Sequence, residues 1–111
     1  MQVIEKTEGK KIAYFVDEDK ITFGDEELTV NVKARERDYE MLVDVCIDKD
    51  GCLTLGVSEN TRRYVAQIEI PPREYDVVDN GYDDEGVLKG VEIQVPFDMN
   101  KCKLSLWGME E

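Results

Sequence analysis

The chain has 111 residues, of which 41% are apolar and 36% are charged, and its formal net charge is −12. A chain of this length fits a single domain, residues 1–111, that buries roughly two thirds of its unfolded surface. The composition is typical of a globular protein rather than a disordered one. The excess of carboxylates repels phosphate backbones and anionic lipid, so we expect neither a nucleic-acid partner nor a membrane partner.

The start of the chain has neither the basic residues nor the apolar block of a secretory signal. No apolar stretch approaches the ~18 residues that a membrane-spanning helix needs. Three cysteines are an odd count, whereas secreted domains of this size usually carry even sets. These features predict a cytoplasmic protein with reduced thiols.

The first predicted element is a β-hairpin with a loop at residues 17–20. This loop would pair Val16 with Ile21 and Tyr14 with Phe23, so apolar residues face each other.

A three-stranded meander is predicted next, between residues 27 and 58. A loop at 49–51, with Gly51 in the left-handed conformation, gives the pairs Ile47–Leu53, Val45–Leu55 and Val43–Val57. A loop at 35–38 gives the pairs Val32–Met41, Val30–Val43 and Leu28–Val45. Both registers place the same apolar face toward the core, which favours this arrangement.

The second half of the chain continues the alternation. A strand with Tyr64, Ala66, Ile68 and Ile70 facing inward should end at the two prolines 71 and 72, which cannot donate to a ladder. A last hairpin with a loop at 98–101 would give the pairs Phe97–Cys102, Val95–Leu104 and Ile93–Leu106. Helices over 39–46 and 58–67 are the competing interpretations, and β-branched residues disfavour the first.

The predicted fold is therefore all-β. We expect an antiparallel sandwich or a small barrel of roughly eight or nine short strands, joined mainly by hairpins, with at most one short helix. Exposed edge strands would also allow a dimer by strand addition.

The chain contains no histidine. This absence removes Ser-His-Asp and Cys-His nucleophiles, the usual zinc ligand sets and any histidine general base. Glycosidases need only paired carboxylates, but their clefts usually need a larger scaffold. We expect a protein that is not an enzyme and that has no resident cofactor.

One acidic segment is a candidate site for calcium or magnesium. Its carboxylates lie around an Asn-Gly turn at positions 80 and 81: Asp76, Asp79, Asp83, Asp84 and Glu85. Acidic loops are more often simply solvated, and that alternative stays open.

A few residues remain as candidates for contact with a ligand or a partner. Trp107 is expected on the outer face of the last hairpin, and Tyr75 and Tyr82 flank the acidic segment. If their loops lie at one end of the fold, four arginines could form a small anion site: Arg35, Arg37, Arg62 and Arg63. A charged turn is the alternative for these arginines.

Three functions remain compatible with the sequence. The first is a β domain that acts through protein contacts, as a homo-oligomer or as a subunit of an assembly. The second is a module that binds a small molecule or carbohydrate through Trp107 and nearby tyrosines. The third is an acidic decoy that occupies a nucleic-acid-binding protein, which the net charge suggests. It is the weakest of the three, because the carboxylates gather in turns rather than along one continuous face.

Overall fold

The computed structural model describes residues 1–82, 84–86 and 88–109, with only the backbone described at 78–80, 82, 88 and 89. Its described residues form strands and two short 3₁₀ turns, η1 (Lys33–Arg35) and η2 (Met99–Lys101), without an α-helix. The strands are β1 (Gln2–Glu5), β2 (Tyr14–Asp17), β3 (Lys20–Phe23), β4 (Leu28–Asn31), β5 (Met41–Asp48), β6 (Leu53–Leu55), β7 (Thr61–Ile70), β8 (Tyr75–Tyr82), β9 (Leu88–Gln94) and β10 (Lys103–Leu106).

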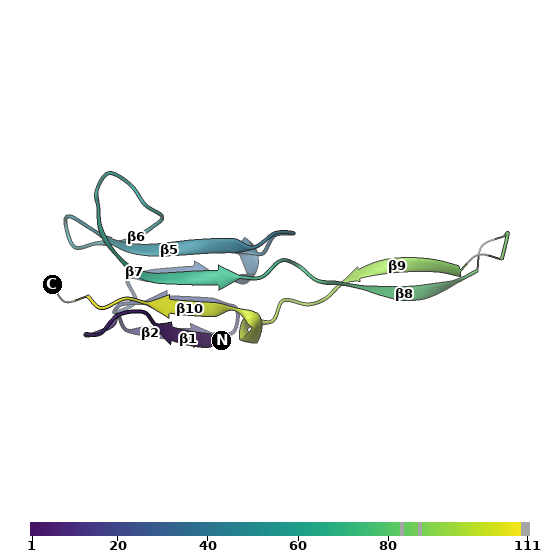
Figure 1. Ribbon diagram of the computed structural model, residues 1–111, viewed down its shortest axis with the longest axis horizontal. Coiled ribbons are helices and arrows are strands. Elements are labelled where there is room, and N and C mark those ends of the chain that lie inside the picture. The colour runs from purple at the N-terminus through teal and green to yellow at the C-terminus, as the bar shows by residue number, and fades with distance from the viewer. Residues whose placement is uncertain (83, 87, 110–111) are drawn as a thin grey trace.

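These strands form three sheets, so the all-β prediction is confirmed (Figure 1). One sheet has five strands in the order β1-β10-β7-β5-β6, and a second has the order β2-β3-β4. All their pairs are antiparallel except that of β1 with β10. Both sheets are open, so the small-barrel alternative is wrong. We call these two sheets the body.

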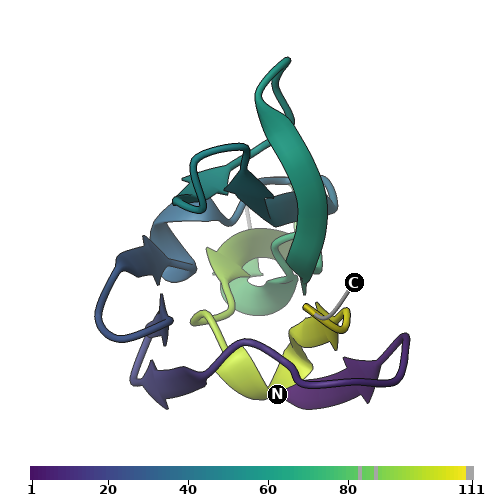
Figure 2. The same ribbon diagram turned by 90° about the vertical axis from the view of Figure 1, so that its left-hand side faces the viewer.

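The body encloses one apolar core, to which both sheets contribute. Figure 2 shows the strands of the two sheets arranged around this interior. The fully buried side chains include Ile21, Phe23 and Val30 from the small sheet and Val45, Ile68 and Leu104 from the large one. The apolar residues of each sheet therefore lie on the face that is turned toward the core, as the alternation predicts.

Two of the predicted hairpins are confirmed. The first pairs Tyr14 with Phe23 and Val16 with Ile21, although its loop is shorter because Asp17 also pairs with Lys20. In the second, the predicted Ile47–Leu53 and Val45–Leu55 pairs both form, and the ladder stops at Leu55.

The predicted pairing of β4 with β5 is wrong. Among the described strands, β4 pairs with β3 alone, while β5 lies between β6 and β7. Turn η1 carries the chain from one sheet to the other, and the ten-residue strand β7 takes the place beside β5. Val30 and Val43 are both buried, but they belong to opposite sheets rather than to neighbouring strands.

The predicted last hairpin is also wrong. Strand β10 pairs with β7 and β1, whereas β9 pairs with β8. The residues expected to form its loop include turn η2, which the Asp98 carboxylate caps by accepting the Asn100 N–H. The alternation of β9 thus belongs to a hairpin outside the body.

Strand β7 forms as predicted and ends at Ile70, before the two prolines. Its register with β5 shifts after the Val45–Ala66 pair, because Cys46 pairs with Tyr64 and leaves Val65 as an extra residue. This β-bulge buries Val65 together with Ala66. Tyr64 was expected inside, but the bulge places it on the surface, where it is 44% exposed.

The third sheet is a two-stranded hairpin, β8 and β9, that projects from one end of the body (Figure 1). We call this hairpin, residues 75–94, the arm. The molecule measures 68 × 25 × 23 Å, and its radius of gyration is 19.0 Å. A compact chain of this length would have a radius of gyration of about 13 Å. The arm explains this elongation.

Candidate functional site

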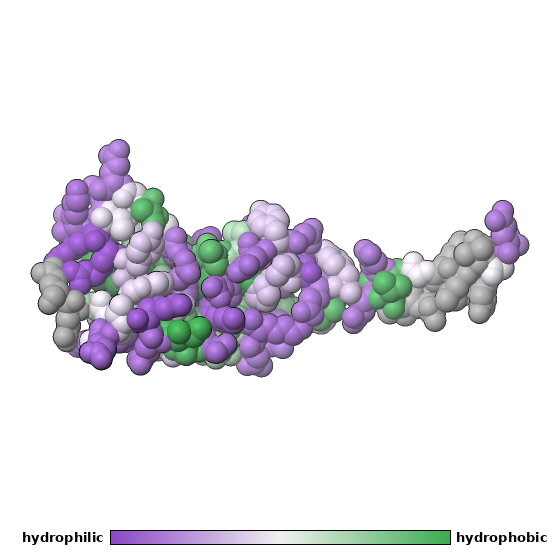
Figure 3. All heavy atoms as spheres, in the orientation of Figure 1, coloured by the Kyte–Doolittle hydropathy of each residue, from purple (hydrophilic) through white to green (hydrophobic). Residues whose placement is uncertain are grey.

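Both faces of the arm carry exposed apolar side chains. The register pairs Val77 with Glu92 and Asp76 with Ile93, so Tyr75 and Val77 lie on one face while Ile93 and Val91 lie on the other. Val77 is 68% exposed and Ile93 is 51% exposed. Figure 3 shows hydrophobic atoms on this projection, between hydrophilic ones. The apolar side chains described on the two faces are therefore open to solvent.

The arm is also strongly acidic. Its 20 residues include six acidic ones and one lysine, which gives a formal net charge of −5. Each face combines its apolar pair with a described carboxylate, Glu92 on the first face and Asp76 on the second. Both carboxylates are exposed. The arm therefore presents apolar and negatively charged groups together.

The backbone of the arm has two open edges. Within the part of the chain that the structure describes, β8 and β9 pair only with each other. A two-stranded ribbon is marginally stable in water on its own, and open edges can pair with another chain. The described parts of the arm contain no proline, which is one of the devices that block such pairing.

A polar network attaches the arm to the body. We call this network the root; its members are Glu36, Asp38, Arg73, Tyr75 and Gln94. Arg73 donates from Nη2 to the Glu36 carbonyl oxygen at 3.0 Å, and its Nε lies 3.8 Å from Glu36 Oε1. Gln94 Nε2 also donates to the carboxylate oxygen Oε1 of Glu36, at 3.5 Å. The nearly buried Glu36 thus contacts Gln94, the last residue of the arm, and Arg73, which lies just before the first.

A second contact of the root involves a tyrosine of the arm itself. The Tyr75 hydroxyl donates to Asp38 Oδ1 at 2.6 Å, and Arg73 Nη1 lies 3.5 Å from the same oxygen. This hydrogen bond lowers the pKa of Asp38 and raises the pKa of Tyr75. The root thus links Tyr75, the first residue of the arm, to the segment of the body that precedes β5.

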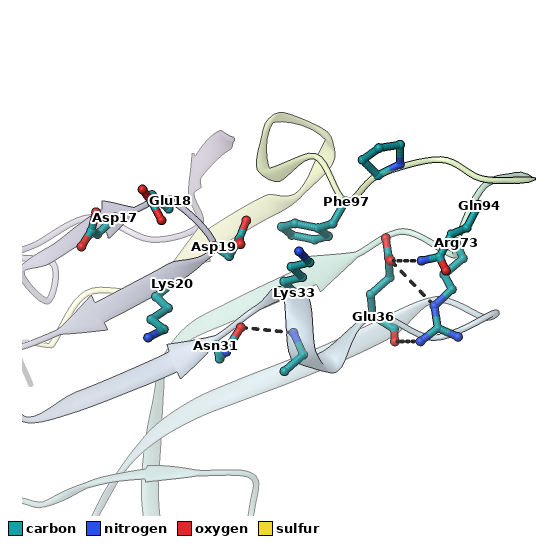
Figure 4. A pocket seen from close by; sticks show the side chains of 12 residues that line it. Asp17, Glu18, Asp19, Lys20, Asn31, Lys33, Glu36, Arg73, Gln94 and Phe97 are labelled. Atoms are coloured by element: carbon teal, nitrogen blue, oxygen red, sulfur yellow. Dashed lines mark hydrogen bonds and ion pairs between the residues drawn. The ribbon is translucent and has the colours of Figure 1, made fainter.

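A cleft of about 730 Å³ lies between the root and the turn that joins β2 to β3. Figure 4 shows this turn on one side of the cleft and Glu36, Arg73 and Gln94 on the other. Seven of its twelve lining residues are charged: Asp17, Glu18, Asp19, Lys20, Lys33, Glu36 and Arg73. Most ligand pockets are lined mainly by apolar side chains, so this lining is unusual for a small-molecule site.

Trp107 does not lie where the sequence analysis expects it. It is half-buried, follows β10, and packs on Tyr64 with 6.0 Å between the ring centroids. Its backbone N–H donates to the Val65 carbonyl oxygen. Trp107 therefore belongs to the body and lines neither the arm nor the cleft.

The structure does not bring the four arginines together. Arg35 and Arg37 precede β5 at the root, whereas Arg62 and Arg63 begin β7 at the other end of the β5–β7 pair. That pair spans eight positions of β5, or roughly 25 Å. Arg63 instead donates to the Met109 carbonyl oxygen at 2.6 Å. The condition for a shared anion site is not met.

The residues of the candidate cation site are spread along the arm. Asp76 and Asp79 lie in β8, and the exposed Asp84 and Glu85 lie in the turn after it. Asp83 is outside the described residues, and only the backbone is described for Asp79 and Tyr82. Among the described side chains, no three cysteine or acidic groups gather as metal ligands. Calcium or magnesium binding stays a prediction.

The buried thiols are poor nucleophiles. Burial raises the pKa of Cys102 to about 11 and also raises the pKa of Cys46, so both thiols stay protonated at neutral pH. Cys52 is exposed, and all three cysteines are free.

Sequence reasoning missed Glu36, Asp38 and Arg73 as members of the root. Glu36 lies between two arginines of the charged segment 33–38, and nothing in its spacing marks it as buried. Arg73 follows the two prolines that end β7. The prolines could have signalled that the chain leaves the body at this point.

The chain matches no protein-family model, and searches among curated proteins and solved structures found no protein similar to it. Within the described part of the chain, no helix has the length and apolar character needed to cross a membrane.

Proposed function

We propose that this protein is a non-enzymatic subunit of a protein assembly and that the arm is its contact element. The observation that carries the proposal is the exposure of apolar side chains on both faces of a hairpin that projects from the body with two open edges. Such edges bind other chains by β-augmentation, in which backbone hydrogen bonds extend a sheet.

The exposed aliphatic side chains give an approximate scale for this contact. Val77, Val91 and Ile93 are 68%, 41% and 51% exposed. Complete burial of such a side chain contributes about 1.5–3 kcal/mol, so covering the half that is exposed contributes about 1 kcal/mol for each. Together they supply about 3 kcal/mol, to which new backbone hydrogen bonds would add. This supports a contact that is specific but reversible.

For the fold, we propose that the two open sheets of the body pack as a sandwich. Buried side chains from both sheets in one core support this proposal. In this arrangement the body is a rigid carrier, and the root sets the direction of the arm.

The cleft beside the root supports a second candidate function, the binding of a small molecule. Its volume of about 730 Å³ lies within the range of known ligand sites. The charged lining argues for a small polar ligand rather than one stacked on Trp107, because the tryptophan lies elsewhere. A thermal-shift screen of charged metabolites, run on the unmodified protein and on Lys33→Gln, would test this candidate. A ligand bound in the cleft should raise the melting temperature of the unmodified protein more than that of the variant, because Lys33 lines the cleft.

A pair of photo-crosslinking variants tests the proposed function. One variant carries the crosslinking residue at Val77 of the arm, and the matched control carries it at Val57, which is 58% exposed on the body. In extracts of the source cells, the Val77 variant should give a discrete adduct that excess unmodified protein competes away. Equal adducts from both positions, or none from Val77, would contradict the proposal.

A further inference from the structure

We infer that the partner of the arm is a basic protein with an open sheet edge on which apolar and basic residues alternate. This inference rests on the proposed function and adds the chemistry of the partner.

The charge of the arm excludes a second copy of this chain as the favoured occupant. Two arms that pair with each other would bring six acidic residues against six, and like charges on facing strands destabilise a sheet. The body offers no better surface, because it carries the remaining −7 of the net charge of −12. Because the arm and the rest of the chain both carry a net negative charge, both attract a partner of positive charge.

The order of acidic and apolar residues along both arm strands indicates which residue types a partner strand should carry. In β8 the acidic Asp76 precedes the apolar Val77, and in β9 the acidic Glu92 lies between Val91 and Ile93. A strand added to either edge places its side chains beside these residues, alternately on the two faces. Lysine or arginine beside each carboxylate, with an apolar residue beside each valine or isoleucine, satisfies both faces of the arm.

The probe is a labelled synthetic peptide that alternates valine with lysine, and its matched control alternates valine with glutamate. Fluorescence anisotropy with the full-length protein measures binding to each peptide at about 50 mM and about 300 mM salt. We expect binding of the lysine peptide alone, at least about tenfold weaker at the higher salt because screening reduces charge attraction. Amide exchange should slow in residues 75–94 when this peptide binds.

Two matched variants assign the binding to the arm. Asp76→Asn combined with Glu92→Gln removes two arm charges, whereas Asp25→Asn combined with Glu26→Gln removes two charges from an exposed turn of the body. Only the arm variant should weaken binding of the lysine peptide, by about tenfold. Equal weakening by both variants would indicate general charge attraction and would overturn the inference.

The remaining outcomes separate this inference from the proposed function. If light scattering shows a dimer with protected arm amides in the free protein, the partner is a second copy and the inference is wrong. If the lysine peptide does not bind while the crosslinker at Val77 still gives its competed adduct, the arm is a contact element whose partner is not basic. The proposed function then stands and the inference falls.

Discussion

Replacing the arm by a short turn should leave the body folded. The replacement removes residues 75–94 and joins Glu74 to Val95 through a two-residue Asn-Gly turn. The structure permits this closure because the Val95 N–H donates to the Glu74 carbonyl oxygen at 2.8 Å, as the first and fourth residues of a β-turn do. Arg73 and Glu36 both remain in the variant.

The expected loss of stability is small because none of the side chains described for the arm belongs to the buried core. Gln94 gives up one long hydrogen bond to Glu36, at 3.5 Å, which contributes at most about 1 kcal/mol. The exposed contact of Tyr75 with Asp38 adds little, because water screens it. We therefore expect the free energy of unfolding to change by no more than about 1 kcal/mol.

Urea denaturation followed by tryptophan fluorescence measures this change. Trp107 is the single tryptophan and is half-buried against Tyr64, so its emission reports the unfolding of the body. A loss greater than about 3 kcal/mol, which is the scale of a large core truncation, would refute the division into body and arm.

Three further predictions follow from the described contacts. Ile68→Ala, which truncates a fully buried side chain, should lower the free energy of unfolding by about 2–5 kcal/mol in the same urea assay; a loss below about 1 kcal/mol would contradict its central place in the core. Tyr75 should ionise only above the usual pKa of about 10, because Asp38 accepts its proton as a hydrogen bond; this contact stabilises the fold below pH 10 and is lost as the pH rises through the raised pKa. Ultraviolet titration should lose its late tyrosine step in Asp38→Asn, and an unchanged titration would show that the contact does not form. A thiol reagent should modify Cys52 rapidly and Cys102 only on unfolding, because Cys102 is buried and its pKa is raised to about 11; equal rates in the native protein would contradict this burial.

Local pairings could be predicted because short loops fix the register. The Tyr14–Phe23 and Val45–Leu55 pairs depend on two turns and on the apolar face that those turns create. This information lies within a few residues of each turn.

Partners that are distant in the chain could not be predicted in the same way. Strand β5 has an apolar face that fits β4 and β7 equally well by pattern, and the longer ladder with β7 is the one that forms. The alternation of β9 likewise fits β10, but β9 pairs with β8. Alternation identifies which face is apolar and does not identify the neighbour.

The candidate site was predicted in part. Five of the six acidic residues of the arm were singled out from the sequence because they cluster around one turn, and Tyr75 was singled out because it flanks them. The arm itself was missed, since its apolar residues were assigned to the core, and the body-packed Trp107 was expected on the surface. Apolar residues in a strand indicate a surface that becomes buried, and they do not distinguish the core from an interface with another chain.

The most direct test of the central claim is amide hydrogen exchange of residues 75–94 in the free protein and in the purified adduct formed through Val77. We expect fast exchange in the free arm, slow exchange in the adduct, and unchanged protection of the body strands β5 and β7. Arm amides that are equally protected in both samples, or equally exposed in both, would contradict the claim that the arm is the contact element.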